Sequence, residues 1–286
     1  WSIGANWYKW NGVMWEAQST PPSSSADKIN LIENDGLCVS SQVPLFVSGT
    51  INTLNVASNS EINLGSASLV VNGDVVNDGI INSMNSTLSF VGSGDQIISG
   101  SGTTSFSDVI VNNGGDLILD SDVTIEGELN LQSDILINES INGPHVLTIG
   151  TSSENTGSLL TNGGVVLGKL KRYFANNSDS YVFPLGYNGS RRDVSVGFVS
   201  SPGTDQFLTV SYNLGYAQLS GDDLYEGLPL VTADGQLIQN YDGEGYWEII
   251  PGSLLMGDSY DAPINSKGYN LDIRCNGISG ASGATI

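Results

Sequence analysis

The chain has 286 residues, with 30 acidic residues against 9 Lys or Arg and a formal net charge of −21. This balance argues against electrostatic binding to DNA, RNA or anionic lipid, because each of those partners needs a basic surface. Charged residues make up 14% of the chain against a usual ~25%, while 36 glycines and 39% hydrophobic residues predict a Gly/Asn/Ser-rich β protein with a sizeable core.

Residues 1–29 form an aromatic segment followed by a Pro/Ser loop at 19–25. Its aromatic residues are Trp1, Trp7, Tyr8, Trp10 and Trp15. We interpret the segment as a cap, because the first coil of a repeat structure otherwise leaves its strand edges unpaired. An aromatic platform that stacks on sugars is the alternative. No apolar run approaches the ~20 residues of a membrane span, and the chain opens on Trp1 without a signal peptide, which indicates a processed piece.

Residues 30–168 carry short apolar triplets with an in-out-in pattern, separated by Gly, Asn, Asp and Ser, and almost no helical periodicity. Triplets start at 117, 123, 129 and 135, and others at 69, 88 and 109. Strands this short suit a parallel β-helix, in which each strand pairs with its equivalent in the next coil. We predict a β-solenoid with about three strands in a rung of roughly 18–22 residues. A Greek-key β-sandwich is the competing architecture.

Four asparagines, Asn72, Asn77, Asn82 and Asn112, lie next to these strands. Asparagine tolerates left-handed turn geometry and can hydrogen-bond its own backbone, so we expect it in the stacked turns.

Longer strands are expected after residue 168. They are predicted near 167–174, 181–186, 194–199, 207–212, 245–250 and 269–273. Strands of five or six residues at wider spacing indicate an antiparallel β-sandwich-like domain over 169–286, and its Gly-rich end suggests that the domain continues beyond 286.

The sequence predicts no catalytic residues. His145 is the only histidine, it follows Pro144 in a predicted surface loop, and the chain contains neither a Gly-x-Ser-x-Gly elbow nor a phosphate-binding Gly-Lys-Ser/Thr loop. Cys38 and Cys275 exclude a Cys-x-x-Cys site by count and spacing. They are either two separate thiols or a pair formed in an oxidising compartment.

Three acidic groups are candidates for carbohydrate or calcium chemistry. They are Asp120 with Asp122, Asp222 with Asp223, and Asp242 with Glu244. Paired carboxylates serve glycosidases, and Asp-x-Asp turns can bind calcium. Complete calcium-loop motifs are missing from the sequence, so we expect no cofactor and no metal ligand, with calcium as the alternative.

Five of the nine basic residues gather at the predicted domain junction: Lys169, Lys171, Arg172, Arg191 and Arg192. Lys169 and Lys171 alternate with Leu170, so we expect both to face solvent. The group is interpreted as local charge balance, with a patch that docks an acidic neighbour or a polyanionic glycan as the alternative.

Three groups of motifs resemble secreted Bacteroidota surface proteins with β-helix repeats. They are Asn6-Trp7 with Trp15, Pro21-Pro22 and Asp27-Lys28-Ile29; Gly94-Asp95-Gln96-Ile97 followed by Thr104-Ser105-Phe106; and Tyr181-x-Phe183-Pro184-Leu185-Gly186 with Tyr246-Trp247-Glu248-Ile249. The resemblance implies export by type IX secretion, a cell-surface or released location, and adhesin roles that include gliding. It supplies no catalytic residues, and a C-terminal sorting domain is not recognisable here.

Together these features predict a non-enzymatic extracellular surface protein, a stalk or adhesin segment. Its partner is expected to be an unidentified surface glycan or protein. The alternatives are a client or accessory subunit of a secretion or gliding assembly, and a polysaccharide-binding or polysaccharide-cleaving β-helix protein. Lyase chemistry is disfavoured because residues 30–168 contain no Lys or Arg to neutralise a uronate carboxylate.

Overall fold

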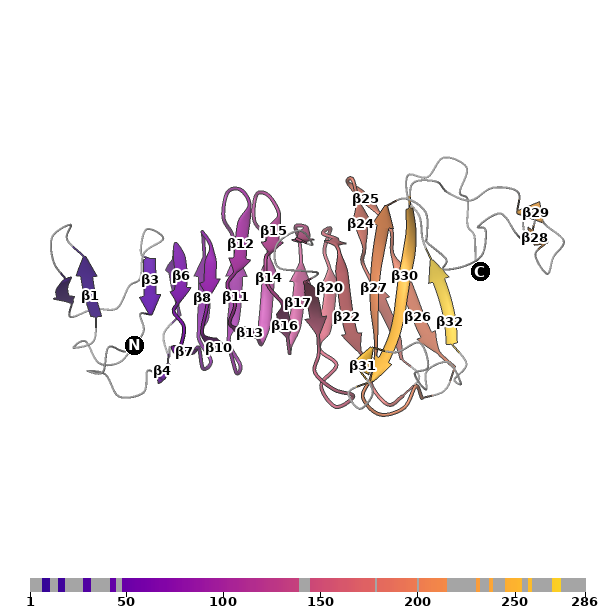
Figure 1. Cartoon of the computed structure of the whole chain (residues 1–286), viewed down its shortest axis with the longest axis horizontal. Coiled ribbons are helices and arrows are strands. Elements are labelled where there is room, and N and C mark those ends of the chain that lie inside the picture. Colours follow the sequence, from indigo (N-terminus) through magenta and orange to yellow (C-terminus); the bar gives the residue numbers. More distant parts are fainter. Residues whose placement is uncertain are drawn as a thin grey trace.

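The computed structural model describes residues 48–138, 145–177, 179–199, 201–214 and 245–252 with their side chains. Of the other residues it describes the backbone of strands at 7–10, 15–18, 28–31, 42–44, 230–231, 237–238, 253, 257–258 and 269–273. Throughout these residues the fold is all-β, with a parallel solenoid followed by antiparallel strands, which confirms the predicted class (Figure 1). None of them forms a helix long and apolar enough to cross a membrane.

Three parallel sheets form the sides of the solenoid. The first sheet contains β3 (Lys28–Leu31), β6 (Thr53–Val56), β9 (Val75–Asn77), β12 (Gln96–Ser99), β15 (Leu117–Leu119), β18 (Ile135–Ile137) and β21 (Val166–Leu167). The second contains β4 (Gln42–Pro44), β7 (Glu61–Asn63), β10 (Ile80–Asn82), β13 (Thr103–Phe106), β16 (Val123–Ile125), β19 (Val146–Ile149) and β22 (Lys169–Tyr173). The third contains β5 (Gly49–Ile51), β8 (Ser68–Val71), β11 (Thr87–Phe90), β14 (Asp108–Val111), β17 (Glu128–Leu131) and β20 (Ser158–Thr161).

The coil length agrees with the predicted repeat. Strands of the third sheet begin at 49, 68, 87, 108 and 128, so successive coils differ by 19 to 21 residues. Leu69, Leu88 and Val109, the starts of three predicted triplets, are register partners on neighbouring coils of this sheet. The next strand of the sheet begins only at 158, because the sixth coil has longer connections on both sides of β19.

The core runs along the inside of the solenoid. In β15, β16 and β18 the outer two residues are buried and the middle one is partly exposed, as the in-out-in pattern predicts. Phe90 and Phe106 are fully buried and meet edge to face with ring centroids 6.4 Å apart. Each such ring removes 150–250 Å² from water, so burial of these side chains is a main stabilising contribution.

The asparagines at the coil corners connect neighbouring coils. Asn77 is fully buried; its Nδ2 donates to the carbonyl of Thr103, and its Oδ1 accepts from Gly79 N. The Nδ2 of Asn72 donates to the carbonyl of Ile51, one coil back. The left-handed conformation that we expected occurs elsewhere in the described residues, for example at Asn59 and Asn188. Asn77 thus makes the local bond to its own backbone that we expected, through Gly79 N, and the Nδ2 groups of Asn72 and Asn77 also bond to neighbouring coils.

The second sheet continues without a break from the solenoid into the antiparallel part. β22 pairs in parallel with β19 on one side and antiparallel with β27 (Gln206–Leu214) on the other. β30 (Gly245–Ser253) and β31 (Gly257–Asp258) follow, so ten strands form one sheet. The predicted domain boundary near 168 thus falls just before a strand that is shared by both parts.

A smaller antiparallel sheet packs against this extension. It contains β23 (Ser180–Phe183), β26 (Val194–Phe198) and β32 (Tyr269–Ile273). Phe174, Tyr181 and Phe198 meet edge to face between the two layers, in line with the predicted sandwich. Three further antiparallel pairs are β1 (Trp7–Trp10) with β2 (Trp15–Gln18), β24 (Gly186–Tyr187) with β25 (Ser190–Arg191), and β28 (Leu230–Val231) with β29 (Leu237–Ile238).

Candidate functional site

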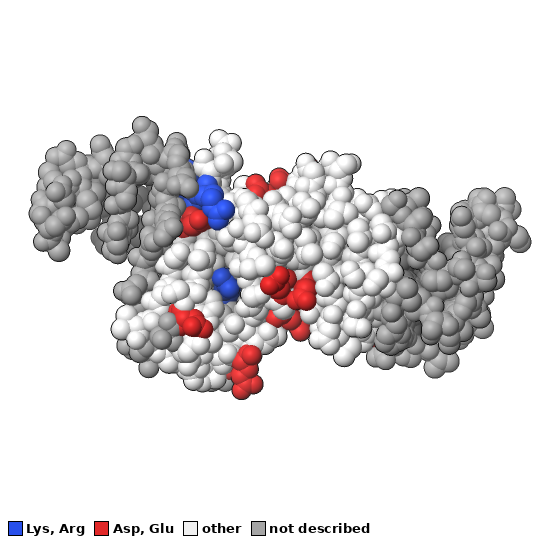
Figure 2. All heavy atoms as spheres, turned by 180° about the vertical axis from the view of Figure 1, so that it is seen from behind, with Lys and Arg blue, Asp and Glu red and all other residues white. Residues whose placement is uncertain are grey.

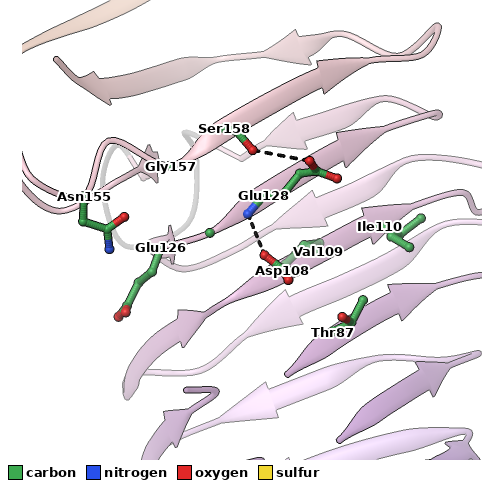
Figure 3. Close-up of a pocket in the computed structure, with 10 residues that line it drawn as sticks. Thr87, Asp108, Val109, Ile110, Glu126, Glu128, Asn155, Gly157 and Ser158 are labelled. Carbon is green, nitrogen blue, oxygen red and sulfur yellow. Dashed lines mark hydrogen bonds between the residues drawn. The ribbon is translucent and has the colours of Figure 1, made fainter. Parts of the chain in front are cut away.

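The third sheet carries an open hollow of about 560 Å³ near the start of its strands β14, β17 and β20. We call it the acidic hollow, because its lining includes Asp108, Glu126 and Glu128 (Figure 3). Asn155, from the loop that connects β19 to β20, lies at the same end as Glu126. Ser158, the first residue of β20, also lines the hollow.

Coil stacking holds the three carboxylates in place. Asp108 Oδ1 accepts a hydrogen bond of 2.8 Å from the backbone N–H of Glu128, one coil further on. Gly127 makes room for this bond, since a Cβ there would lie 2.2 Å from Asp108 Oδ1. Glu126 Oε1 accepts from Ser105 Oγ at 2.5 Å, and Glu128 Oε2 accepts from Ser158 Oγ over a longer 3.5 Å. Each carboxylate therefore accepts at least one hydrogen bond from a neighbouring coil.

The loop that connects β19 to β20 and carries Asn155 ends at a glycine whose position requires the absence of a side chain. Gly157 has a φ of +58°, and a Cβ there would lie 2.8 Å from Ile149 Cγ2 and 2.9 Å from the carbonyl of Gly127. A side chain at this position would push the loop away from the coil beneath it. The close approach keeps Asn155 and Ser158 beside the acidic strands.

A second acidic feature, which sequence reasoning missed, lies at the corner before the first sheet. Asp74, Asp95, Asp116 and Asp134 each directly precede a strand of this sheet, and we call them the aspartate column. Asp95 Oδ1 accepts from the backbone N–H of Asp116 at 2.9 Å. Burial raises the pKa of Asp116, and the charges of Asp134 and Asp95 raise it further. The sequence signal was a Gly-Asp or Ser-Asp pair before each apolar triplet.

Accepting a backbone N–H from the following coil is a general use of aspartate in this solenoid. It is made by Asp74, Asp78, Asp95, Asp108, Asp122 and Asp134, at distances of 2.8 to 3.0 Å. The donors are N–H groups of turns and of the first residues of strands, and hydrogen bonds to a charged acceptor are stronger than neutral ones.

The predicted acidic candidates that the structure describes have structural partners. Asp120 Oδ1 accepts from Asn138 Nδ2 at 2.8 Å, and Asp122 Oδ1 accepts from the backbone N–H of Val146. In the described part of the chain no three His, Cys, Asp or Glu side chains are grouped so that they could hold a metal ion. Asp222 with Asp223, Asp242 with Glu244, and Cys38 with Cys275 lie outside the described residues. The side chains of Trp1, Trp7, Tyr8, Trp10 and Trp15 do too, so cap and sugar platform both stay open.

His145 differs from the exposed loop residue that we expected. Its side chain is only 13% exposed, and its Nδ1 lies 3.6 Å from Asp122 Oδ1. His145, directly before β19, therefore lies with its ring beside Asp122 of the preceding coil.

The basic residues at the junction do not form one surface patch, because two of them are buried. Arg172 and Arg192 are 6% and 2% exposed. Arg172 donates from Nη1 to the carbonyl of Val182 at 2.7 Å, and its guanidinium lies 5.3 Å from the ring centroid of Tyr181. Burial lowers the pKa of Arg172 to about 10. The alternative of a five-residue docking patch is thus wrong for these two arginines.

The remaining three basic side chains of the group are partly exposed. Lys169 and Lys171 alternate with the buried Leu170, as expected, and Lys171 Nζ lies 3.6 Å from the ring centroid of Phe207. Arg191 pairs with Asp193 at 3.0 Å. Figure 2 shows basic side chains on the antiparallel part, whereas the solenoid surface in view carries acidic side chains.

No family model, no curated protein and no solved structure matches this chain. The fold and the acidic surface therefore have to carry the functional argument.

Proposed function

We propose that the chain is a non-enzymatic extracellular surface protein, in which the solenoid is a stalk and its faces make adhesive contacts. The observation that carries the proposal is the unbroken ten-stranded second sheet, which joins the solenoid to the antiparallel part through β22. A shared sheet resists bending between the two parts better than a flexible linker does. It suits a spacer that holds its end at a set distance.

Coil stacking gives the stalk a length that can be changed in defined steps. Deletion of residues 75–95 removes β9, β10 and β11 and joins Asp74 to Gln96. The new junction keeps the pattern of the parent, because Asp74 then directly precedes β12 as Asp95 did, and both aspartates precede a strand of the first sheet. We expect the variant to fold cooperatively, and X-ray scattering to record a particle shorter by about 5 Å, one strand spacing.

The surface role is tested on cells of the source organism. We expect antibodies against the chain to label intact cells or the culture medium, and beads coated with the chain to adhere to cells or to surface polysaccharide. Labelling only after lysis contradicts the extracellular location, and beads that bind nothing contradict the adhesive role. A stoichiometric partner that co-purifies from native material would favour the accessory-subunit alternative. Release of reducing ends from a polysaccharide panel would favour an enzyme.

A further inference from the structure

We propose that the acidic hollow and the adjoining edge of β20 dock an extended peptide segment of another protein that carries Lys or Arg. This inference goes beyond the stalk role and does not depend on it. It joins two observations on the third sheet, a hollow with carboxylate acceptors and a sheet edge at which no described strand pairs.

The negative charge of the hollow favours a partner with basic side chains. Asp108, Glu126 and Glu128 line one hollow, and residues 30–168 contain no Lys or Arg that could neutralise them. In the fully described residues the ion pairs are His145 with Asp122 and Arg191 with Asp193, both outside the hollow. Three carboxylates that line one hollow favour a cationic partner, because a Lys or Arg side chain can donate charge-assisted hydrogen bonds to them.

The edge of β20 favours a partner segment with an extended backbone. β20 pairs with β17 on one side and with no other described strand, and three of its four residues are exposed. Leu160, in the middle of this edge strand, is 44% exposed. An extended segment can add to such an edge through backbone hydrogen bonds, with alternate side chains on each face.

Ser158 connects the two features. It is the first residue of β20 and lines the hollow, and it lies in register with Glu128 on β17. A segment that pairs along β20 therefore begins beside the carboxylates, where a basic side chain on its outer face reaches them. Asn155 lines the hollow at the same end as Glu126.

The test uses the purified chain and a fluorescein-labelled peptide of alternating Lys and Val, with fluorescence anisotropy as the readout. We expect saturable binding that weakens with salt, because exposed charges are screened. The double substitution Glu126→Gln with Glu128→Gln should weaken binding about fivefold, as two surface ion pairs are lost. Asn155→Lys, which introduces a competing cation without removing a carboxylate, should weaken it similarly.

Glu61→Gln is the matched control. Glu61 lies on the solenoid outside the hollow and, like Glu126, accepts a side-chain bond from a neighbouring coil, here from Asn82 Nδ2 at 2.6 Å. We expect this variant to bind as the parent does, and circular dichroism to show all variants folded. Equal weakening by Glu61→Gln would overturn the proposal, since attraction would then be general to an acidic surface. Absence of binding, or equal binding of a Lys-Pro peptide that cannot form a strand, would overturn it too.

Discussion

Replacement of Asn77 by alanine tests how much the coil corners contribute to stability. Asn77 is 0% exposed at the end of β9. Its Nδ2 donates to the carbonyl of Thr103 at 2.9 Å and to Thr104 Oγ1 at 3.0 Å, and its Oδ1 accepts from Gly79 N at 3.1 Å. Alanine removes all three bonds at once. The side chain thus couples its own coil to the next one.

The expected loss follows from the groups left behind. The N–H of Gly79 loses an acceptor inside the fold, and the carbonyl of Thr103 loses a donor. A buried polar group without its partner costs about 1–3 kcal/mol, so we expect Asn77→Ala to lower the free energy of unfolding by about 2–4 kcal/mol. Asn72→Ala is the control, because Asn72 is only half-buried and its one coil-to-coil bond is 3.3 Å long. We expect it to cost less than about 1 kcal/mol.

Urea unfolding followed by circular dichroism measures both variants against the parent. An equal change in the midpoint for the two substitutions, with unchanged slopes, would refute the reasoning. It would mean that asparagine acts through local turn preference rather than through the bonds between coils. A changed slope for Asn77→Ala alone would instead indicate that one coil unfolds separately from the rest.

Three further predictions concern charge and close packing. The pKa of Asp116 is raised in the folded state, so its contribution to stability is fullest below the ordinary value of 3.8 and is lost as pH rises through the raised pKa. Asp116→Asn should therefore raise the melting temperature at neutral pH. The melting temperature of this variant should also fall less than that of the parent as pH rises. Gly115→Ala would place a Cβ 2.1 Å from Asp95 Oδ1 and should cost about 1–3 kcal/mol in urea unfolding, whereas Gly94→Ala, where a Cβ meets nothing within 4 Å, should be tolerated. Arg172→Met should cost less stability in urea unfolding than Arg172→Ala, because both remove the donor to the carbonyl of Val182 but only methionine fills the buried space; an equal loss for the two variants would contradict this.

The solenoid could be predicted because its apolar residues recur in the sequence at a regular spacing. Strands β15 and β18 bury their two outer residues, so the apolar triplets 117–119 and 135–137 mark them in the sequence. Equal spacing of such triplets then indicates the coil length. Pairing beyond the triplets has no such sequence signal: Leu170 pairs with Val210 across a 40-residue separation that contains four other strands, β23, β24, β25 and β26. The join of β22 to β27 therefore required the structure.

Site prediction succeeded less well because the sequence shows which residues are charged but not what they contact. Arg172 and Arg192 looked like surface charges, yet aromatic rings cover both guanidinium groups. The aspartate column is visible in the sequence as repeated Gly-Asp or Ser-Asp pairs, but a repeated polar residue is not in itself a ligand motif. The acidic hollow depends on the loop before Ser158, whose path over Gly127 has no sequence pattern.

The strongly acidic composition itself follows from coil stacking. Each turn presents backbone N–H groups to the coil before it, and these donors need an acceptor close to the chain. Aspartate supplies a short, charged acceptor at six such places, whereas Lys and Arg have only donors and cannot replace it. The cost is repulsion wherever aspartates stack, as at Asp116. Bonding to the backbone thus explains these six aspartates, Asp108 of the hollow among them, whereas Glu126 and Glu128 accept from serine side chains instead.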